Sequence, residues 1–345
     1  MMSDQSLFIQ SDAKKINEAV DLSPFNKASI VITGASGLVG QYMLAALANA
    51  QIEGVEPKQI YLFIKNEPSD CLREIAKNLQ VTWCRGDICD SSLIAGLPNN
   101  LDYIIHAAGY GQPQKFLENE ISTIAMNTEV TSALLKKLSK EGSFIFISTS
   151  EIYSGSKDVP YKESITGHTN TDHPRACYIE GKRCGEAIVN AYHKQGFDAK
   201  SIRLALAYGP GVRLDDRRVM NEVIKKGLID QKIALMDSGT SLRTYIYITD
   251  AVEFMFKILL KGKSNIYNLS GKSRTSIAQM AELISTSLSV PLSIPQSHAG
   301  LAGAPEDVSL SLDRLLSDFP KENFVSFDAG VQAVIQWYRL LLKAA

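Results

Sequence analysis

The sequence predicts an α/β fold in which a doubly wound parallel sheet is followed by a smaller C-terminal α/β lobe. Three observations lead to this fold class. Short apolar runs alternate with segments of helical periodicity, as expected when helices cover both faces of a parallel sheet. A glycine-rich turn directly follows the first of these runs, and the regular alternation is lost after about Tyr208. The 345 residues, 45% of them hydrophobic, suffice for one large α/β domain and a smaller lobe.

The elements of the main sheet follow in order along the chain. A short leader helix is expected at residues 13–20, before a linker that ends at Pro24. Each strand is an apolar run bounded by polar or turn-forming residues, and the expected strands are 30–32, 60–64, 80–84, 101–106, 144–148 and 199–205. Helices are expected at 71–79 and 124–140, where apolar residues recur at helical spacing.

These assignments divide the chain into three parts. An N-terminal leader helix and linker take residues 1–28, and the sheet domain takes residues 29–207. Residues 208–345 mainly form the smaller lobe, with some strands and helices returning to the sheet domain. The elements expected in this last part are strands at 233–235, 244–248 and 265–269 and helices near 275–288 and 328–343.

The composition argues against several classes of partner. The formal net charge is −1, so we expect no broad electrostatic attraction to nucleic acid or to an anionic membrane. No apolar run reaches the ~18 residues of a membrane-spanning helix. Five cysteines, an odd number without zinc-like spacing, indicate a reducing compartment, and the chain is expected to be cytoplasmic. His168, His173 and His193 lack partners at metal-ligand spacing, so no metal site is predicted.

A glycine-rich turn is expected to hold a phosphate group. Gly34, Gly37 and Gly40 follow the apolar run 30–32 and precede an apolar helix, which is the context that a dinucleotide-binding turn requires. Gly34 can adopt backbone angles closed to other residues, Gly37 lets the backbone approach a pyrophosphate, and Gly40 lets the helix pack closely. The helix N-terminus offers free N–H groups to the phosphates. The turn therefore favours a Rossmann-like nucleotide site over a purely structural turn.

Tyr178 and Lys182 are candidates for acid–base chemistry. Their spacing of four in a helix-like stretch places both side chains on one face. We expect the ammonium of Lys182 to lower the pKa of the Tyr178 phenol from its usual value near 10. Such a tyrosine can take a proton from a sugar hydroxyl while hydride passes to a nicotinamide. The alternative is a solvated lysine beside a half-buried tyrosine.

A cluster of hydroxyls and one carboxylate follows the fifth expected strand. It consists of Ser148, Thr149, Ser150, Glu151 and Tyr153. Ligands of doubly wound sheets bind at the carboxyl ends of the strands, so a reacting group would meet this cluster. The alternative is a capping cluster for the next segment. The presence of the glycine turn, this cluster and the Tyr–Lys pair in one chain favours an active site.

Together these motifs resemble one enzyme family. Over residues 29–340 the chain resembles the extended short-chain dehydrogenase/reductases that act on nucleotide sugars. The matching motifs are Thr33-Gly34-x-x-Gly37-x-x-Gly40, Gly86-Asp87-Ile88, His106-Ala107-Ala108, Ser148-Thr149-Ser150-Glu151-x-Tyr153 and Tyr178-x-x-x-Lys182. Within that family, segments 174–183, 216–219 and 240–247 are most similar to the UDP-glucuronate decarboxylases. The resemblance implies an NAD(P)-binding Rossmann domain and a C-terminal substrate lobe.

The resemblance also implies roles for individual residues. Thr149, Tyr178 and Lys182 would form a Thr–Tyr–Lys triad, with Tyr178 as the base and Lys182 on the nicotinamide ribose. Ser150 and Glu151 would position the substrate carboxylate or manage the proton returned to C5. The implied dinucleotide-binding residues are Gly34, Ser36, Gly37, Leu38, Val39, Gly40, Lys65, Asp87, Ile88, Ala107, Ala108, Gly109, Tyr178 and Lys182. The implied substrate-binding residues are Pro113, Arg218, Leu235 and Arg243.

The implied reaction is the decarboxylation of a UDP-uronic acid such as UDP-glucuronate through a 4-keto intermediate. The 4,6-dehydratases carry an aspartic acid at the position of Ser150, which argues against 4,6-dehydration here. Two alternatives stay open. One is a UDP-sugar 4-epimerase or dehydratase in surface-polysaccharide biosynthesis, and the other is a non-catalytic regulator that senses NAD(P).

Some positions depart from the family pattern. Lys65 follows the second strand, where the family carries an acidic residue for the adenosine ribose; NAD is the expected cofactor, and NADP stays open because a lysine tolerates a 2′-phosphate. Leu206 replaces a polar contact to the nucleotide sugar, and the loop 109–116 matches only in part. These changes leave a sugar other than glucuronate open. The family also implies a homodimer through helices at 121–140 and 175–194.

Overall fold

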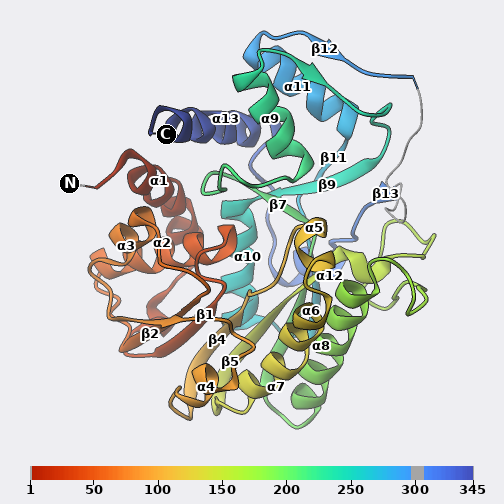
Figure 1. The fold of residues 1–345 in the computed structure, drawn as a ribbon. Coiled ribbons are helices and arrows are strands. Elements are labelled where there is room, and N and C mark those ends of the chain that lie inside the picture. Colours follow the sequence, from red (N-terminus) through yellow and green to blue (C-terminus); the bar gives the residue numbers. More distant parts are fainter. Residues whose placement is uncertain (1, 297–306, 345) are drawn as a thin grey trace.

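The computed structural model describes residues 2–296 and 307–344 and confirms the predicted α/β fold class (Figure 1). Its centre is a seven-stranded sheet of order β10-β6-β5-β4-β1-β2-β3, in which all neighbouring strands are parallel. The strands are β1 (Ser29–Thr33), β2 (Gln59–Ile64), β3 (Val81–Arg85), β4 (Leu101–His106), β5 (Leu138–Thr149), β6 (Asp198–Leu204) and β10 (Ile266–Leu269).

Helices cover both faces of this sheet (Figure 1). On one face α2 (Leu38–Ile52) packs against α3 (Asp70–Ala76) and α10 (Ile248–Lys261). On the other face α8 (Ala176–Lys194) packs against β5, β6 and the helices α6 (Glu120–Asn127) and α7 (Glu129–Leu135). The central strand β1 contributes to both cores, because Ile30 and Ile32 belong to one apolar cluster and Val31 to the other. A strand buried on both faces is therefore a continuous apolar run, as the sequence shows.

The strand order reverses beside β1. The chain builds β1, β2 and β3 toward one edge and then returns to place β4, β5 and β6 on the other side of β1. The loops that leave β1 and β4 therefore diverge at the carboxyl ends of adjacent strands. Such a switch point opens a crevice in which doubly wound proteins bind ligands.

The single helix predicted at residues 124–140 is wrong. The structure has two shorter helices, α6 (Glu120–Asn127) and α7 (Glu129–Leu135), and β5 already begins at Leu138. Three threonines of this region donate their hydroxyls to the carbonyl four residues earlier, Thr128 to Ile124 among them at 2.9 Å. These side-chain bonds compete with the helical ladder, and the break falls at Thr128.

The N-terminal helix is longer than predicted. Helix α1 (Asp4–Ala19) has Ser3 as its N-cap, and the hydroxyl of Ser3 accepts from the N–H of Ser6. The helix packs against α2, α3 and α10. The sequence predicted no helix at α10, which carries Phe254, Met255 and Phe256. All three are fully buried. Its polar residues Asp250, Glu253 and Lys257 recur at helical spacing, but the two carboxylates are buried and paired with Lys321, so they do not face solvent as on a surface helix.

The C-terminal part adds smaller sheets above the carboxyl ends of the main strands (Figure 1). A four-stranded sheet contains β7 (Leu206–Tyr208), β9 (Leu242–Tyr247), β11 (Ser273–Ser276) and β13 (Asp307–Val308), and β8 (Ile233–Ala234) pairs with β12 (Leu292–Ser293). The helices of this part are α9 (Val219–Ile229), α11 (Ile277–Leu288), α12 (Asp313–Asp318) and α13 (Phe327–Ala344). The strand expected at 265–269 is β10, which lies at the edge of the main sheet.

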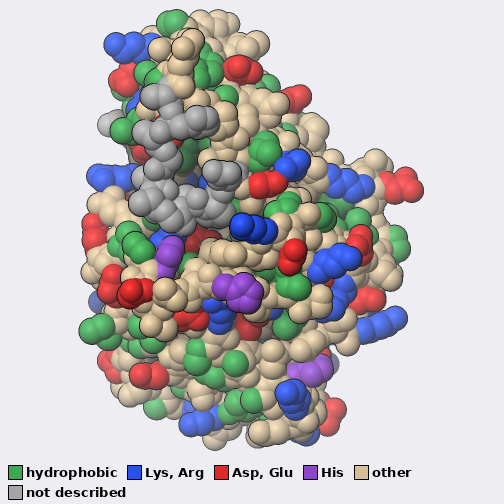
Figure 2. All heavy atoms as spheres, turned by 90° about the vertical axis from the view of Figure 1, so that its right-hand side faces the viewer, with side chains coloured by type: hydrophobic (Ala, Val, Ile, Leu, Met, Phe, Trp, Pro, Cys, Tyr) green, Lys and Arg blue, Asp and Glu red, His purple; other side chains and the backbone are tan. Residues whose placement is uncertain are grey.

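The surface carries charges of both signs. On the face shown in Figure 2, acidic and basic side chains of the described residues are interspersed. Among the described residues no helix combines the length and apolar character needed to span a bilayer.

Candidate functional site

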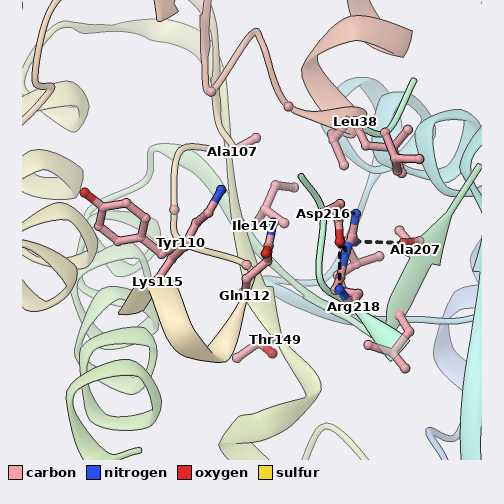
Figure 3. A pocket seen from close by; sticks show the side chains of 18 of the residues that line it. Leu38, Ala107, Tyr110, Gln112, Lys115, Ile147, Thr149, Ala207, Asp216 and Arg218 are labelled. Carbon is pink, nitrogen blue, oxygen red and sulfur yellow. Dashed lines mark hydrogen bonds and ion pairs between the residues drawn. The ribbon is translucent and has the colours of Figure 1, made fainter. Parts of the chain in front are cut away.

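A cavity of about 490 Å³ lies at the carboxyl ends of β1, β4 and β5. From the glycine turn and the loop after β4 it is lined by Gly34, Ser36, Gly37, Leu38, Val39, Ala107, Gly109, Tyr110, Gly111, Gln112 and Lys115. The end of β5 adds Ile147 to Glu151, and Lys65, Tyr178, Lys182 and two segments of the C-terminal half complete the wall. In Figure 3, Tyr110 and Lys115 lie on the opposite side of the cavity from Asp216 and Arg218.

The glycine turn has the geometry of a phosphate cradle. Gly34 has φ +70°, and a Cβ there would lie 2.8 Å from the carbonyl oxygen of Ala107. Gly37 is the N-cap of α2, and none of the described side chains caps that helix. Its first N–H groups therefore face the cavity side of the turn, where an anion can accept from them. At Gly40 a Cβ would lie 2.5 Å from the Cα of Ala35, so only glycine lets the helix start this close to the turn.

Most predicted dinucleotide-binding residues line the cavity, but four do not. Gly40, Asp87, Ile88 and Ala108 lie outside its lining. Asp87 is near it, because its carboxylate lies 3.7 Å from the ammonium of Lys65. The same ammonium donates to the hydroxyl of Tyr110 at 3.1 Å. Lys65, which follows β2, therefore presents its ammonium to the cavity, where Asp87 and Tyr110 of neighbouring loops hold it.

Thr149, Tyr178 and Lys182 meet at the floor of the cavity. Thr149 ends β5 and is hydrogen-bonded to the hydroxyl of Tyr178, which lies in the first turn of α8. Lys182 follows one turn later on the same helix and donates to the carbonyl of Ile147 at 2.7 Å. The spacing predicted from the sequence thus brings the three side chains to one place.

The predicted lowering of the Tyr178 pKa is wrong for this structure. Burial and the carboxylate of Glu151 raise the pKa of Tyr178 to about 12, and only the hydrogen bond with Thr149 and the charge of Arg175 oppose them. Lys182 instead shows a pKa lowered to about 7, because burial disfavours its ammonium more than Glu186 supports it. Desolvation is the largest cause of both shifts, and the ammonium, which is directed at Ile147, is not among the groups that stabilise the ionised phenol.

A half-buried ion pair lies beside the tyrosine. Arg175 pairs with Glu151, and its guanidinium lies 5.3 Å from the ring centroid of Phe116. The ring of Phe116 in turn stacks on Tyr178 with centroids 4.6 Å apart and an interplanar angle of 3°. Arg175 therefore connects the two predicted reacting groups. Arg175 lies within the matching segment 174–183, but the sequence did not place it in the site, because its contact with Phe116 joins residues that are distant in the chain.

Burial raises the pKa of Glu151 above its usual value, although the charges of Arg175 and Arg243 oppose the shift. Arg243 lies on β9 and is itself mostly desolvated, which lowers its pKa. Arg243 does not line the cavity, and neither do the predicted substrate residues Pro113 and Leu235. The charge of Arg243 nevertheless acts on the Glu151–Arg175 pair and lowers the pKa of Glu151.

Arg218 lines the cavity, as predicted, in a fixed orientation. Its guanidinium donates to Asp216 at 2.7 to 3.1 Å and to the carbonyl of Ala207 at 3.3 Å (Figure 3). Leu206 also lines the cavity and is 39% exposed. This side of the cavity thus combines one held cation with an exposed apolar side chain.

A model of the NAD dependent epimerase/dehydratase family matches residues 30–270. The chain belongs to this family. The curated relative UDP-glucuronic acid decarboxylase 1 of Xenopus tropicalis is 29% identical over 265 residues, which are 76% of this chain and 61% of the relative. This chain thus spans about six tenths of that relative's length. A dTDP-4-dehydro-6-deoxy-D-allose reductase of Streptomyces is 25% identical over 90% of this chain and 96% of its own.

Solved structures of this family share the fold. A dTDP-glucose 4,6-dehydratase from Streptomyces venezuelae, crystallised with NAD, superposes with a TM-score of 0.78 at 19% identity and covers 90% of this chain and 97% of its own. A UDP-glucuronic acid 4-epimerase from Bacillus cereus gives a TM-score of 0.73 at 22% identity and covers 91% and 99%. Among the described residues, no three His, Cys, Asp or Glu side chains are grouped to hold a metal ion.

Alanine substitutions at two glycines of this turn are expected to have different effects, one on stability and one on dinucleotide binding. Gly40→Ala forces a methyl group against Ala35, and we expect it to lower the free energy of unfolding by about 1–3 kcal/mol. At Gly37 a Cβ lies 3.2 Å from the nearest described atom, the carbonyl oxygen of Gly34, and φ is −80°. Gly37→Ala should therefore cost less than about 1 kcal/mol and weaken dinucleotide binding instead. Urea unfolding and NAD⁺ titration of both variants separate the effects; equal unfolding losses would contradict the prediction.

Proposed function

We propose that this chain is an NAD-dependent enzyme that decarboxylates a UDP-uronic acid, such as UDP-glucuronate, through a 4-keto intermediate. The observation that carries the proposal is the half-buried Glu151–Arg175 pair beside the Tyr178 hydroxyl, with Arg243 acting on it. Cationic groups next to a proton acceptor suit a sugar that carries a carboxylate beside the carbon to be oxidised. The curated relatives named UDP-glucuronic acid decarboxylase, at 24–29% identity, agree with this substrate class.

The residues of the glycine turn fit a dinucleotide. The N–H groups that begin α2 would hold the pyrophosphate, because side chains are absent at Gly34 and Gly37. Lys182 would bind the nicotinamide ribose, and Lys65 would lie at the adenosine ribose. When bound, the nicotinamide accepts hydride from sugar C4 and returns it, so the reaction needs no external oxidant. NADP stays open as a second cofactor, because Lys65 suits a 2′-phosphate.

Tyr178 is proposed to take the proton of the sugar 4-hydroxyl. Thr149 holds the phenol by a hydrogen bond, and Phe116 fixes the plane of its ring. Because burial holds the pKa of Tyr178 at about 12, its deprotonation depends on a cation directed at it. Lys182 lies one helical turn away and would supply that charge by turning from Ile147 toward the ribose and the phenol.

Decarboxylation then follows from the 4-keto group. The bond between C5 and C6 breaks, its electron pair moves into the C4 carbonyl through C5, and C6 leaves as CO₂. A proton then returns to C5. Glu151 is suited to deliver that proton, because burial raises its pKa above the usual carboxyl value. Arg175 would hold the substrate carboxylate or Glu151, and Ser150, which also lines the cavity, would position it.

A 4-epimerase acting on another UDP-sugar is the second candidate. The observation that favours it is Leu206, which exposes an apolar side chain on the substrate side of the cavity. An apolar group there changes the contacts available to the sugar nucleotide. A non-catalytic NAD(P) sensor is the third candidate. The presence of Thr149, Tyr178 and Lys182 together in the cavity lining argues against it.

Mass spectrometry of the products separates these candidates. The protein is incubated with NAD⁺ and, in parallel, with UDP-glucuronate, UDP-galacturonate, UDP-glucose and UDP-galactose. Loss of CO₂ from a uronate supports decarboxylation. An unchanged mass with an inverted C4, seen by proton NMR, supports epimerisation, and loss of water supports dehydration. If no sugar changes although NAD⁺ binds, the enzyme proposal is overturned.

The proposal extends to the organisation of the chain. Residues 29–207 would bind the dinucleotide and residues 208–345 mainly the sugar nucleotide, in a cytoplasmic protein.

We also propose a homodimer through α6 and α8, because Ile121 and Ile124 expose 84% and 45% of their surface on α6. A dimeric mass in solution scattering is expected, and Ile121→Glu should shift it toward the monomer. A monomeric wild type would overturn this part of the proposal.

A further inference from the structure

One wall of the cavity is held by its backbone carbonyls. Residues 211–216, here called the 211–216 wall, follow β7 and line the cavity with Gly211, Val212, Arg213, Asp215 and Asp216. This wall contains no helix or strand. One backbone hydrogen bond lies within it, from the N–H of Asp216 to the carbonyl of Arg213 at 3.1 Å. The shape of the rest depends on bonds to elements outside it, since a loop has no ladder of its own.

Three successive carbonyls of the wall accept from side chains of two helices. The carbonyl of Gly211 accepts from the amide nitrogen of Gln41 on α2 at 3.2 Å. The carbonyl of Val212 accepts from the indole nitrogen of Trp337 on α13 at 2.7 Å. The carbonyl of Arg213 accepts from the hydroxyl of Tyr338 on α13 at 3.4 Å. Helix α13 lies beyond the segment 30–270 that the family model matches.

Gln41 joins the wall to the glycine turn. Its amide nitrogen also donates to the carbonyl of Ser36 at 3.0 Å, and Ser36 lines the cavity in the glycine turn. The side chain is 7% exposed. One buried amide group thus ties the dinucleotide side of the cavity to the substrate side.

Trp337 is anchored independently of the wall. It is 3% exposed, and its ring contacts Phe8 of α1 edge-on at 6.3 Å between centroids. On the far end of the wall, the ammonium of Lys225 donates to the carbonyls of Leu214 and Asp216, both at 2.9 Å. The wall is therefore fixed from both ends, and its end at Asp216 carries the carboxylate that orients Arg218.

We infer that Gln41 and Trp337 are positioning residues for the sugar nucleotide, which set the 211–216 wall against the glycine turn. The inference rests on the proposed function, because it assigns the wall to the nucleotide-sugar side of the cavity. Trp337 acts on the substrate side alone. Gln41 contacts both sides, so it also couples the binding of the dinucleotide to the binding of the sugar nucleotide.

Trp337→Phe tests the first part, because it keeps an aromatic ring near Phe8 and removes the N–H donor together with the five-membered ring, a loss of volume that the control variant shares. We expect the Kd for UDP, measured by calorimetry on the NAD⁺-loaded protein, to rise about tenfold, since a buried carbonyl loses its partner. The Kd for NAD⁺ should change less than about twofold. The matched control is Trp83→Phe, which alters the chain's other tryptophan, on β3. An unchanged Kd for UDP in Trp337→Phe overturns the inference.

Gln41→Met tests the coupling, because methionine keeps the length of the side chain without its donors. We expect it to weaken UDP and NAD⁺ binding about threefold each, and to reduce the factor by which NAD⁺ changes the Kd for UDP. The control is Gln51→Met at the far end of α2, where the glutamine donates to the carbonyl of Asn78. A coupling factor equal to that of the wild type overturns this part.

A measurement without substrate distinguishes failure of this inference from failure of the proposed function. Hydrogen exchange of the peptide 209–218 should be faster in Trp337→Phe and Gln41→Met than in the wild type and the two controls. If the wild type binds no UDP but this exchange pattern is found, the substrate assignment fails and the positioning role stands. If exchange is the same in all variants, the positioning role fails.

Discussion

Tyr178→Phe is expected to lower turnover about a hundredfold to ten-thousandfold, the usual range for loss of a positioned acid–base group. The substitution removes the hydroxyl that is bonded to Thr149 and keeps the ring. Its stacking on Phe116, at 4.6 Å between centroids, is therefore preserved. The effect should appear in the rate of hydride transfer, followed by the absorbance of reduced nicotinamide in a single turnover. The Kd for NAD⁺ should stay within about threefold of the wild-type value, since the hydroxyl is not part of the glycine turn.

The control for this variant is Tyr192→Phe, which makes the same change on the same helix, beside Phe197 and outside the cavity lining. It should retain the wild-type rate. If Tyr178→Phe kept more than a tenth of the wild-type rate, Tyr178 would not be the proton acceptor. If it lost NAD⁺ binding as well, the effect would be structural.

Glu151→Gln should separate the two halves of the proposed reaction. Glutamine is nearly the same size but removes the negative charge that pairs with Arg175 and the proton that burial favours on this carboxyl. We expect CO₂ release to fall about a hundredfold to a thousandfold, while reduced nicotinamide still forms. Rapid quenching with detection of CO₂, beside the absorbance of reduced nicotinamide, measures both steps.

Glu180→Gln is the matched control, because Glu180 pairs with Arg183 on the same helix as Tyr178 but does not line the cavity. It should release CO₂ at the wild-type rate. Equal loss of both steps in Glu151→Gln would assign Glu151 to substrate binding, and no loss would remove it from the proposed mechanism.

The sequence predicted the parts of the site that are local in the chain. Gly34, Gly37 and Gly40 form one turn, and Tyr178 and Lys182 share one helix face, so their spacing is enough to place them. It also predicted the doubly wound parallel sheet, because parallel strands that are buried on both faces are continuous apolar runs. These are properties of a few neighbouring residues and of general chain geometry.

The remaining features depend on residues that are distant in sequence. The pKa of Tyr178 is raised by burial that comes from packing against elements such as α5 (Pro113–Leu117), which carries Phe116. The contact of Arg175 with Phe116 and the bond from Trp337 to Val212 join segments far apart in the chain. Helix α10, where the sequence predicted no helix, lies between the sheet and α1, and its buried carboxylates Asp250 and Glu253 pair with Lys321, which is far away in the chain.

The central claim is decarboxylation through a 4-keto sugar, and one labelling experiment tests it most directly. UDP-glucuronate carrying deuterium at C4 is converted in ordinary water with NAD⁺, and the reverse experiment uses unlabelled substrate in deuterium oxide. The account predicts a UDP-pentose that keeps the C4 deuterium in the first case and gains one deuterium at C5 in the second. A six-carbon product with inverted C4 and no solvent label at C5 would contradict it.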